Sequence, residues 1–131
     1  MANVLLVAQT QSDTEMNMSD ATSNPSGQPT PPERFYVCRL LAPRPTFVTD
    51  MTPEERQAME AHAGYWREHL RQGVAVVFGP VADPKGPWGL GVIRVKSEEQ
   101  MRKLVEHDPA VLARIGASYE VLPMLNAVVA T

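Results

Sequence analysis

Residues 52–73 read TPEERQAMEAHAGYWREHLRQG and carry the signals of one amphipathic helix. The hydroxyl of Thr52 can cap the helix start, Pro53 suits the first turn, and Glu55 completes a capping box. Gly73 can adopt the left-handed conformation that ends many helices. We therefore predict a single helix here, and the rest of the chain is organised around it.

This helix has one apolar stripe and one histidine beside it. At 100° per residue the stripe contains Met59, Ala63, Trp66 and Leu70. His62 lies about 60° from the centre of the stripe, where a side chain can enter a cleft beside the core. An imidazole there could act as a general acid or base, because its reference pKa is near neutrality. The alternative is a partly buried histidine that only holds a backbone carbonyl.

The first strand is predicted at residues 34–41, where aromatic and branched side chains dominate. Alternation places Tyr36, Cys38 and Leu40 on one face and the odd-numbered residues, including Arg39, on the other. Because Cys38 is the single cysteine and lies in an apolar run, we expect a buried, inert thiol and no internal disulfide.

Two further strands follow the central helix. Residues 74–79 are apolar throughout, which predicts a strand buried on both faces. Residues 80–87 are dense in turn formers and predict a hairpin connection. The next strand, at 88–95, is loosened by Gly89 and Gly91, where another backbone or a ligand could approach closely.

A second helix and a last strand complete the pattern. The helix should open with a capping box at Ser97 and Gln100 and stop near His107, before an Asp-Pro pair. Its inward side chains are Met101, Leu104 and Val105. A short extra turn at 110–115 then precedes a strand at 119–125.

The order strand, helix, strand, strand, helix, strand predicts an α+β fold, the ferredoxin-like βαββαβ sandwich with an antiparallel sheet. Both helices would cover one face of the sheet and leave the other open. A homodimer that packs sheet against sheet would bury the open face, and we expect one.

Residues 1–33 differ in composition from the rest of the chain. They hold four acidic and no basic side chains and are dense in polar residues and proline. Such a segment buries too little apolar surface to offset its ordering entropy, so we predict a disordered N-terminal tail, or alternatively a start-site extension. The remaining residues, 34–131, form one domain.

Charge and hydropathy exclude several classes of function. The chain has a net charge of −3, and the part beyond the acidic tail is nearly neutral, so it lacks the basic footprint of nucleic-acid binding. No apolar run is long enough to span a membrane. Without a secretory signal pattern, we expect a cytoplasmic protein.

Several short motifs occur in a fixed order along the chain. They are His-Ala-Gly-Tyr-Trp at 62–66, Gly-Val at 73–74, Gly-Pro at 79–80 with Asp83 and Gly86 after it, and Asp-Pro at 108–109. In this order and spacing they resemble the YciI-like, or YCII-related, family over roughly residues 34–125.

The resemblance implies a dimeric α/β-barrel built from ferredoxin-like protomers, with a His–Asp pair in the active site. His62 and Asp108 are the matching positions. Some members of that family resemble enzymes that eliminate chloride from chlorinated hydroxyquinols. From the residues alone, Asp108 is also an ordinary N-cap for the turn after Pro109, and the two roles are compatible.

Other side chains could contact a substrate. Arg39 could hold an anionic group or form an interface ion pair, and Trp66 could wall a planar substrate or belong to the core. Asp83 is a candidate ligand that is equally a turn former. A metal site is not predicted, because His62 and His69 stand about 10 Å apart along the helix. No nucleotide or phosphate motif appears, so we expect no cofactor.

Three functions fit these observations. The first is a small cofactor-independent acid–base enzyme, of lyase or isomerase type, acting on a small organic acid or hydroxylated ring. The second is a dimeric module that binds a small ligand without turnover. The third is an accessory dimer that offers a partner-binding surface.

Overall fold

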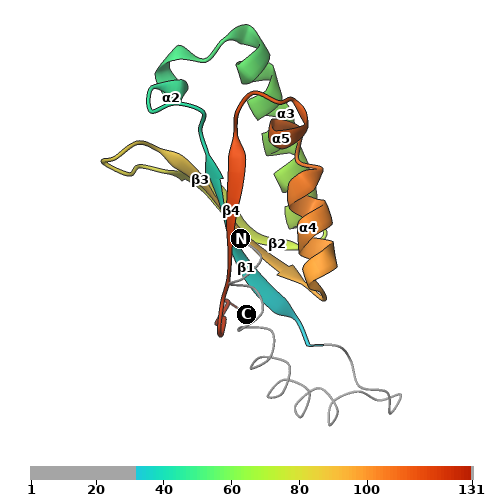
Figure 1. Cartoon of the computed structure of the whole chain (residues 1–131). Coiled ribbons are helices and arrows are strands. Elements are labelled where there is room, and N and C mark those ends of the chain that lie inside the picture. Colours follow the sequence, from blue (N-terminus) through green and yellow to red (C-terminus); the bar gives the residue numbers. More distant parts are fainter. Residues whose placement is uncertain (1–31, 131) are drawn as a thin grey trace, which may run out of the picture.

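The computed structural model describes residues 32–130, so the predicted tail lies almost wholly outside the described residues. Figure 1 shows the order of the elements along the chain. They are β1 (Arg34–Leu41), α2 (Phe47–Asp50), α3 (Pro53–Arg71), β2 (Ala75–Val81), β3 (Trp88–Val95), α4 (Glu98–Glu106), α5 (Pro109–Leu112) and β4 (Ser118–Pro123).

The strands form one antiparallel sheet in the order β2-β3-β1-β4. Helix α3 links β1 to β2, with β3 between them, and α4 and α5 link β3 to β4, with β1 between them. The helices α3 to α5 lie together on one side of the sheet (Figure 1). The predicted α+β, ferredoxin-like βαββαβ fold is therefore confirmed.

The core lies between the sheet and the helices α3 and α4. On β1 the predicted alternation is confirmed, since Tyr36, Cys38 and Leu40 are buried there. Cys38 faces Gly91 of β3 across the sheet. Burial, reinforced by the negative charge of Asp108, raises the pKa of Cys38 to about 12, so the thiol stays protonated.

Helix α3 begins and ends as predicted. The Glu55 amide donates to the Thr52 hydroxyl at 3.1 Å, and the Thr52 amide donates to Glu55 Oε1 at 2.9 Å, which completes the capping box. Beyond the last turn, Gly73 has a φ of 78°, a backbone conformation that residues with a Cβ atom rarely adopt.

The buried face of α3 is turned relative to the predicted apolar stripe. Leu70 is 43% exposed, so the prediction that it belongs to the face packed on the core is wrong. The buried side chains are Glu55, Ala58 and Trp66, a face that passes close to His62. Glu55 and His62 are held on this side by polar partners from other segments, and an apolar pattern cannot reveal such partners.

Strand β2 also departs from the prediction. Val77 is 47% exposed, so burial on both faces is wrong. The strand lies at an edge of the sheet and contacts α3 on one side only. It continues through Pro80 to Val81, two residues into the predicted connection, because an edge strand tolerates a proline in its ladder.

The remaining differences are small. Helix α2 was not predicted, α5 begins at Pro109, and β4 ends at Pro123. The predicted capping box of α4 is only half formed, because Gln100 accepts from the Lys96 amide and not from that of Ser97. In residues 32–130, no helix combines the length and the apolarity needed to cross a bilayer.

Candidate active site

His62 on α3 and Asp108 at the start of α5 are in direct contact. His62 Nδ1 lies 2.8 Å from Asp108 Oδ2 and 3.0 Å from Oδ1. Asp108 is in extended backbone conformation before Pro109, and its Oδ1 accepts from the Ala110 amide at 2.9 Å. The same carboxylate therefore caps α5 and holds the imidazole.

The carboxylate of Asp108 is fully buried and receives further donors. Trp66 Nε1 donates to Oδ2 at 2.9 Å, and the Tyr119 hydroxyl donates to the same oxygen. Burial by itself would raise the pKa of Asp108, but the hydrogen bond and charge of His62, together with the hydrogen bonds from Tyr119 and the Ala110 amide, hold that pKa below its usual value. Asp108 is therefore a buried anion near neutral pH.

Trp66 is fixed in place by the sheet beneath it. Its side chain is buried, and a Cβ built on Gly91 would lie 2.4 Å from Trp66 Cη2. The close approach at Gly91 is therefore made by this indole, and not by another backbone or a ligand as predicted. Trp66 belongs to the core, lines the cavity described below and donates to Asp108.

Tyr119 was missed by sequence reasoning. It faces Leu40 on β1, so it lies on the inward face of β4 with Val121. That alternation could have placed its side chain toward the helices, but nothing in the sequence indicates Asp108 as its partner. Burial and then the charge of Asp108 raise the pKa of Tyr119 far above its usual value, so its hydroxyl remains a donor.

A cavity of about 330 Å³ lies beside His62. Its walls come from the 42–51 segment, α3 and the strands β2 and β3, with Leu40 of β1 and Tyr119 of β4. Among the apolar residues that form it are Phe47, Val48, Met51, Met59, Phe78 and Trp88. No charged side chain of the described residues lines it, and His62 is the imidazole in its lining.

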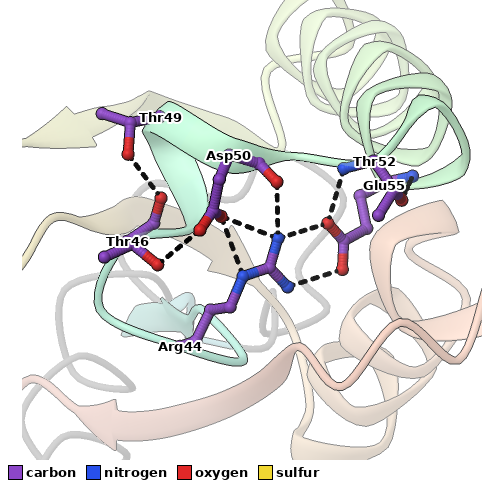
Figure 2. A network of polar contacts seen from close by, with 6 residues as sticks. All are labelled: Arg44, Thr46, Thr49, Asp50, Thr52 and Glu55. Atoms are coloured by element: carbon purple, nitrogen blue, oxygen red, sulfur yellow. Dashed lines mark hydrogen bonds and ion pairs between the residues drawn. The ribbon is translucent and has the colours of Figure 1, made fainter.

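An arginine holds the 42–51 segment, which forms part of this cavity. Figure 2 shows its polar contacts. Arg44 donates to both oxygens of Glu55, at 2.7 and 2.9 Å, and to Asp50 Oδ1 at 2.8 Å. Asp50 also accepts from the Thr46 hydroxyl at 2.7 Å. Because Glu55 belongs to α3, these bonds tie the segment carrying Phe47 to the helix that carries His62.

These contacts shift the pKa values of both acids. The hydrogen bonds from Arg44, followed by that from the Thr52 amide, lower the pKa of Glu55 to about 2. Hydrogen bonds from Thr46 and Arg44 lower the pKa of Asp50. The Arg44 network is therefore fully charged at neutral pH.

Two other candidate residues lie outside the cavity. Arg39 points to the open face of the sheet, where Nη1 lies 2.6 Å from Glu120 Oε1 and its guanidinium sits 4.4 Å from the Trp88 ring. Asp83 accepts from the Lys85 amide at 2.9 Å and from Trp88 Nε1 at 3.0 Å, as a turn former does. The structure does not bring either one to His62.

The described residues contain no group of three or more side chains placed to hold a metal ion. His69 Nδ1 contacts the backbone oxygen of Tyr65 at 2.8 Å, within its own helix.

Comparison with known proteins gives one family. The family model described as the YCII-related domain matches residues 35–125. Among solved structures, the fold is similar to that of SnoaB, a cofactor-independent oxygenase from Streptomyces nogalater, with 14% identity, 70% of this chain and 90% of that chain covered, and a TM-score of 0.37. That likeness is too distant to bear on function. No curated protein matches the chain.

Proposed function

The chain belongs to the family of YCII-related domains, and on that premise we propose that it is a small acid–base enzyme, of lyase or isomerase type, that needs no cofactor. The observation that carries the proposal is the contact between His62 and the buried anion Asp108 beside an apolar cavity. A buried charge is costly unless it is paired, and a paired buried charge beside a cavity is a candidate functional site.

Asp108 gives the imidazole a defined role. With the Nδ1 proton directed at the carboxylate, the lone pair of a neutral His62 is on Nε2. Nε2 then accepts a proton from the substrate, and the charge of Asp108 stabilises the resulting imidazolium. An isomerisation returns that proton to another atom of the same molecule. In an elimination the leaving group departs with its bonding electron pair, and the proton passes from His62 to solvent.

The cavity lining favours one of the predicted substrate classes. A carboxylate would enter without a cationic partner, because no lysine or arginine of the described chain lines the cavity. A neutral, weakly acidic molecule such as a hydroxylated ring has an apolar body that Phe47, Phe78 and Trp88 can contact. We therefore favour the hydroxylated ring over the organic acid.

Proton exchange tests this function before a substrate is known. Candidate hydroxylated rings and carbon acids are incubated with the protein in D₂O, and deuterium uptake is followed by NMR. The wild type should catalyse exchange, whereas His62→Asn should not. His69→Asn is the matched control on the same helix, and it should retain activity. Equal exchange by wild type and His62→Asn would exclude this role of His62.

A ligand-binding module without turnover is the second candidate, and the cavity itself favours it. In that case cavity-sized apolar compounds should raise the melting temperature of wild type and His62→Asn alike, with no exchange in D₂O. The cavity gives less support to an accessory protein with a solid core.

A homodimer is part of the same proposal. The sheet face away from the helices carries Val37, Val77 and Leu122, the last two 47% and 38% exposed. A second copy of the chain could bury this face, since a self-complementary contact needs only one such surface.

A further inference from the structure

We propose that Tyr119 is a positioning residue which, together with Trp66, sets the proton affinity of His62 through Asp108. This inference deepens the proposed function and rests on it for its relevance to turnover. The effect on His62 is measurable without a substrate, so this inference and the proposed function can be refuted independently of each other.

The first step is the crowding of one carboxylate oxygen. Asp108 Oδ2 receives His62 Nδ1 at 2.8 Å, Trp66 Nε1 at 2.9 Å and the Tyr119 hydroxyl. Trp66 Nε1 also lies 3.0 Å from the Tyr119 oxygen, so the three donors form one cluster. Oδ1 is occupied by the Ala110 amide at 2.9 Å.

The second step is the electrostatic consequence of that crowding. Asp108 is fully buried, so its anionic charge depends on the protein donors around it. Each neutral donor stabilises the anion and leaves less of its charge to stabilise an imidazolium. Removing the Tyr119 hydroxyl should therefore make His62 bind its proton more tightly. Removing the charge of Asp108 should have the opposite effect.

The third step is that the neighbouring thiol and phenol groups do not titrate near neutral pH. The pKa of Cys38 on β1 is about 12, raised by burial and by Asp108, and the pKa of Tyr65 on α3 is raised to about 12 by the same causes. No charged side chain of the described residues lines the cavity beside His62. A change in the titration of His62 can therefore be read as a change at Asp108.

Tyr65 provides a matched control. Its hydroxyl donates to the Leu104 backbone oxygen at 2.6 Å, is partly buried and does not touch Asp108. Tyr65→Phe likewise removes one partly buried tyrosine hydroxyl and its hydrogen bond, so any general loosening of the protein should appear in it as well as in Tyr119→Phe.

The experiment is a histidine titration by NMR on the full chain, labelled at the imidazole ring. The chain has three histidines, and His69 and His107 each contact a backbone oxygen of their own helix region, so they serve as internal references. In Tyr119→Phe the midpoint of His62 should move up by about half a pH unit to one unit, the worth of one hydrogen bond. In Asp108→Asn it should move down, and in Tyr65→Phe it should stay in place.

An unchanged or lowered His62 midpoint in Tyr119→Phe, or an equal shift in Tyr65→Phe, would overturn the inference. If Tyr119→Phe does not fold, Trp66→Phe decides, because it keeps a ring against Gly91 and removes the Nε1 donor. Its His62 midpoint should also rise, and a midpoint that stays in place counts against the proposal. Absence of exchange activity in the wild type would refute the proposed function, but it would not change the conclusion drawn from the His62 midpoints.

Discussion

His62 Nδ1 lies 2.8 Å from Asp108 Oδ2, and the two residues are 46 positions apart in the chain. The contact joins the middle of α3 to the N-terminus of α5, so the packing of these two helices sets the geometry of the site. Asp108 cannot move without losing its cap on α5, because Oδ1 is bound to the Ala110 amide. Because the helix cap fixes Asp108, and Asp108 contacts His62 Nδ1, the cap also fixes the orientation of the imidazole.

Asp108→Asn should lower turnover by about 10- to 100-fold, as part of the 10²–10⁴-fold that a general acid or base contributes. The variant keeps an oxygen for the cap but loses the charge that stabilises the imidazolium. The rate is measured on whichever compound exchanges in D₂O. Glu99→Gln on α4, an equally isosteric change at an exposed carboxylate, is the control and should have no effect. An equal loss in both variants would contradict an orienting role of Asp108.

Gly91→Ala should destabilise the protein by about 1–3 kcal/mol, as overpacked core substitutions do. The new Cβ would lie 2.4 Å from Trp66 Cη2, so the indole must shift and its bond to Asp108 must weaken. Urea unfolding followed by circular dichroism measures the stability. Gly79→Ala is the control, because a Cβ there has nothing within 4 Å. Equal stabilities of the two variants would show that Trp66 is not wedged against Gly91.

The sheet could be predicted from the sequence because its evidence is local. The alternation of Tyr36, Cys38 and Leu40 lies within one strand, and the caps at Thr52 and Ser97 lie within one helix turn. The covering of a strand's two faces is not local, and the apolar run of β2 therefore suggested burial on both faces where Val77 is 47% exposed.

Local sequence patterns and the family resemblance identified two residues of the site but not the contacts among its residues. His62 came from its helix position and Asp108 from the family resemblance, while their contact required the packing of α3 on α5. The donors Trp66 Nε1 and Tyr119 OH come from two further positions that meet only in space. Glu55 was recognised as part of the capping box, but its second partner, Arg44, lies in the loop between β1 and α2, which has no periodic pattern.

Arg44→Gln should lower the melting temperature at pH 7 and weaken the effect of cavity ligands on it, because the segment carrying Phe47 loses its tie to α3. The pKa of Glu55 is depressed from 4.5 to about 2, so the stability from this pair is fully present above about pH 4.5. It is lost as the pH falls toward 2. The gap in melting temperature between variant and wild type should therefore narrow over that range.

The control for this series is Arg71→Gln, which breaks the exposed pair of Arg71 with Glu68 at the far end of α3. Its melting temperature should stay close to that of the wild type, since exposed ion pairs contribute little. A gap for Arg44→Gln that stays constant from pH 7 to pH 2 would mean that the charge of Glu55 does not hold the segment.

Val37→Glu should convert the proposed homodimer to monomers, or cause aggregation, when followed by sedimentation velocity. Val37 faces Val92 on β3 and Leu122 on β4, so a carboxylate there would stand in the middle of the open sheet face. Burying that charge in an interface without a partner is costly, whereas a monomer leaves it in water. Leu70→Glu, at a 43% exposed position on the helix side, is the control and should remain dimeric. A monomeric wild type at micromolar concentration would refute the dimer, and dissociation of Leu70→Glu alone would move the interface to the helices.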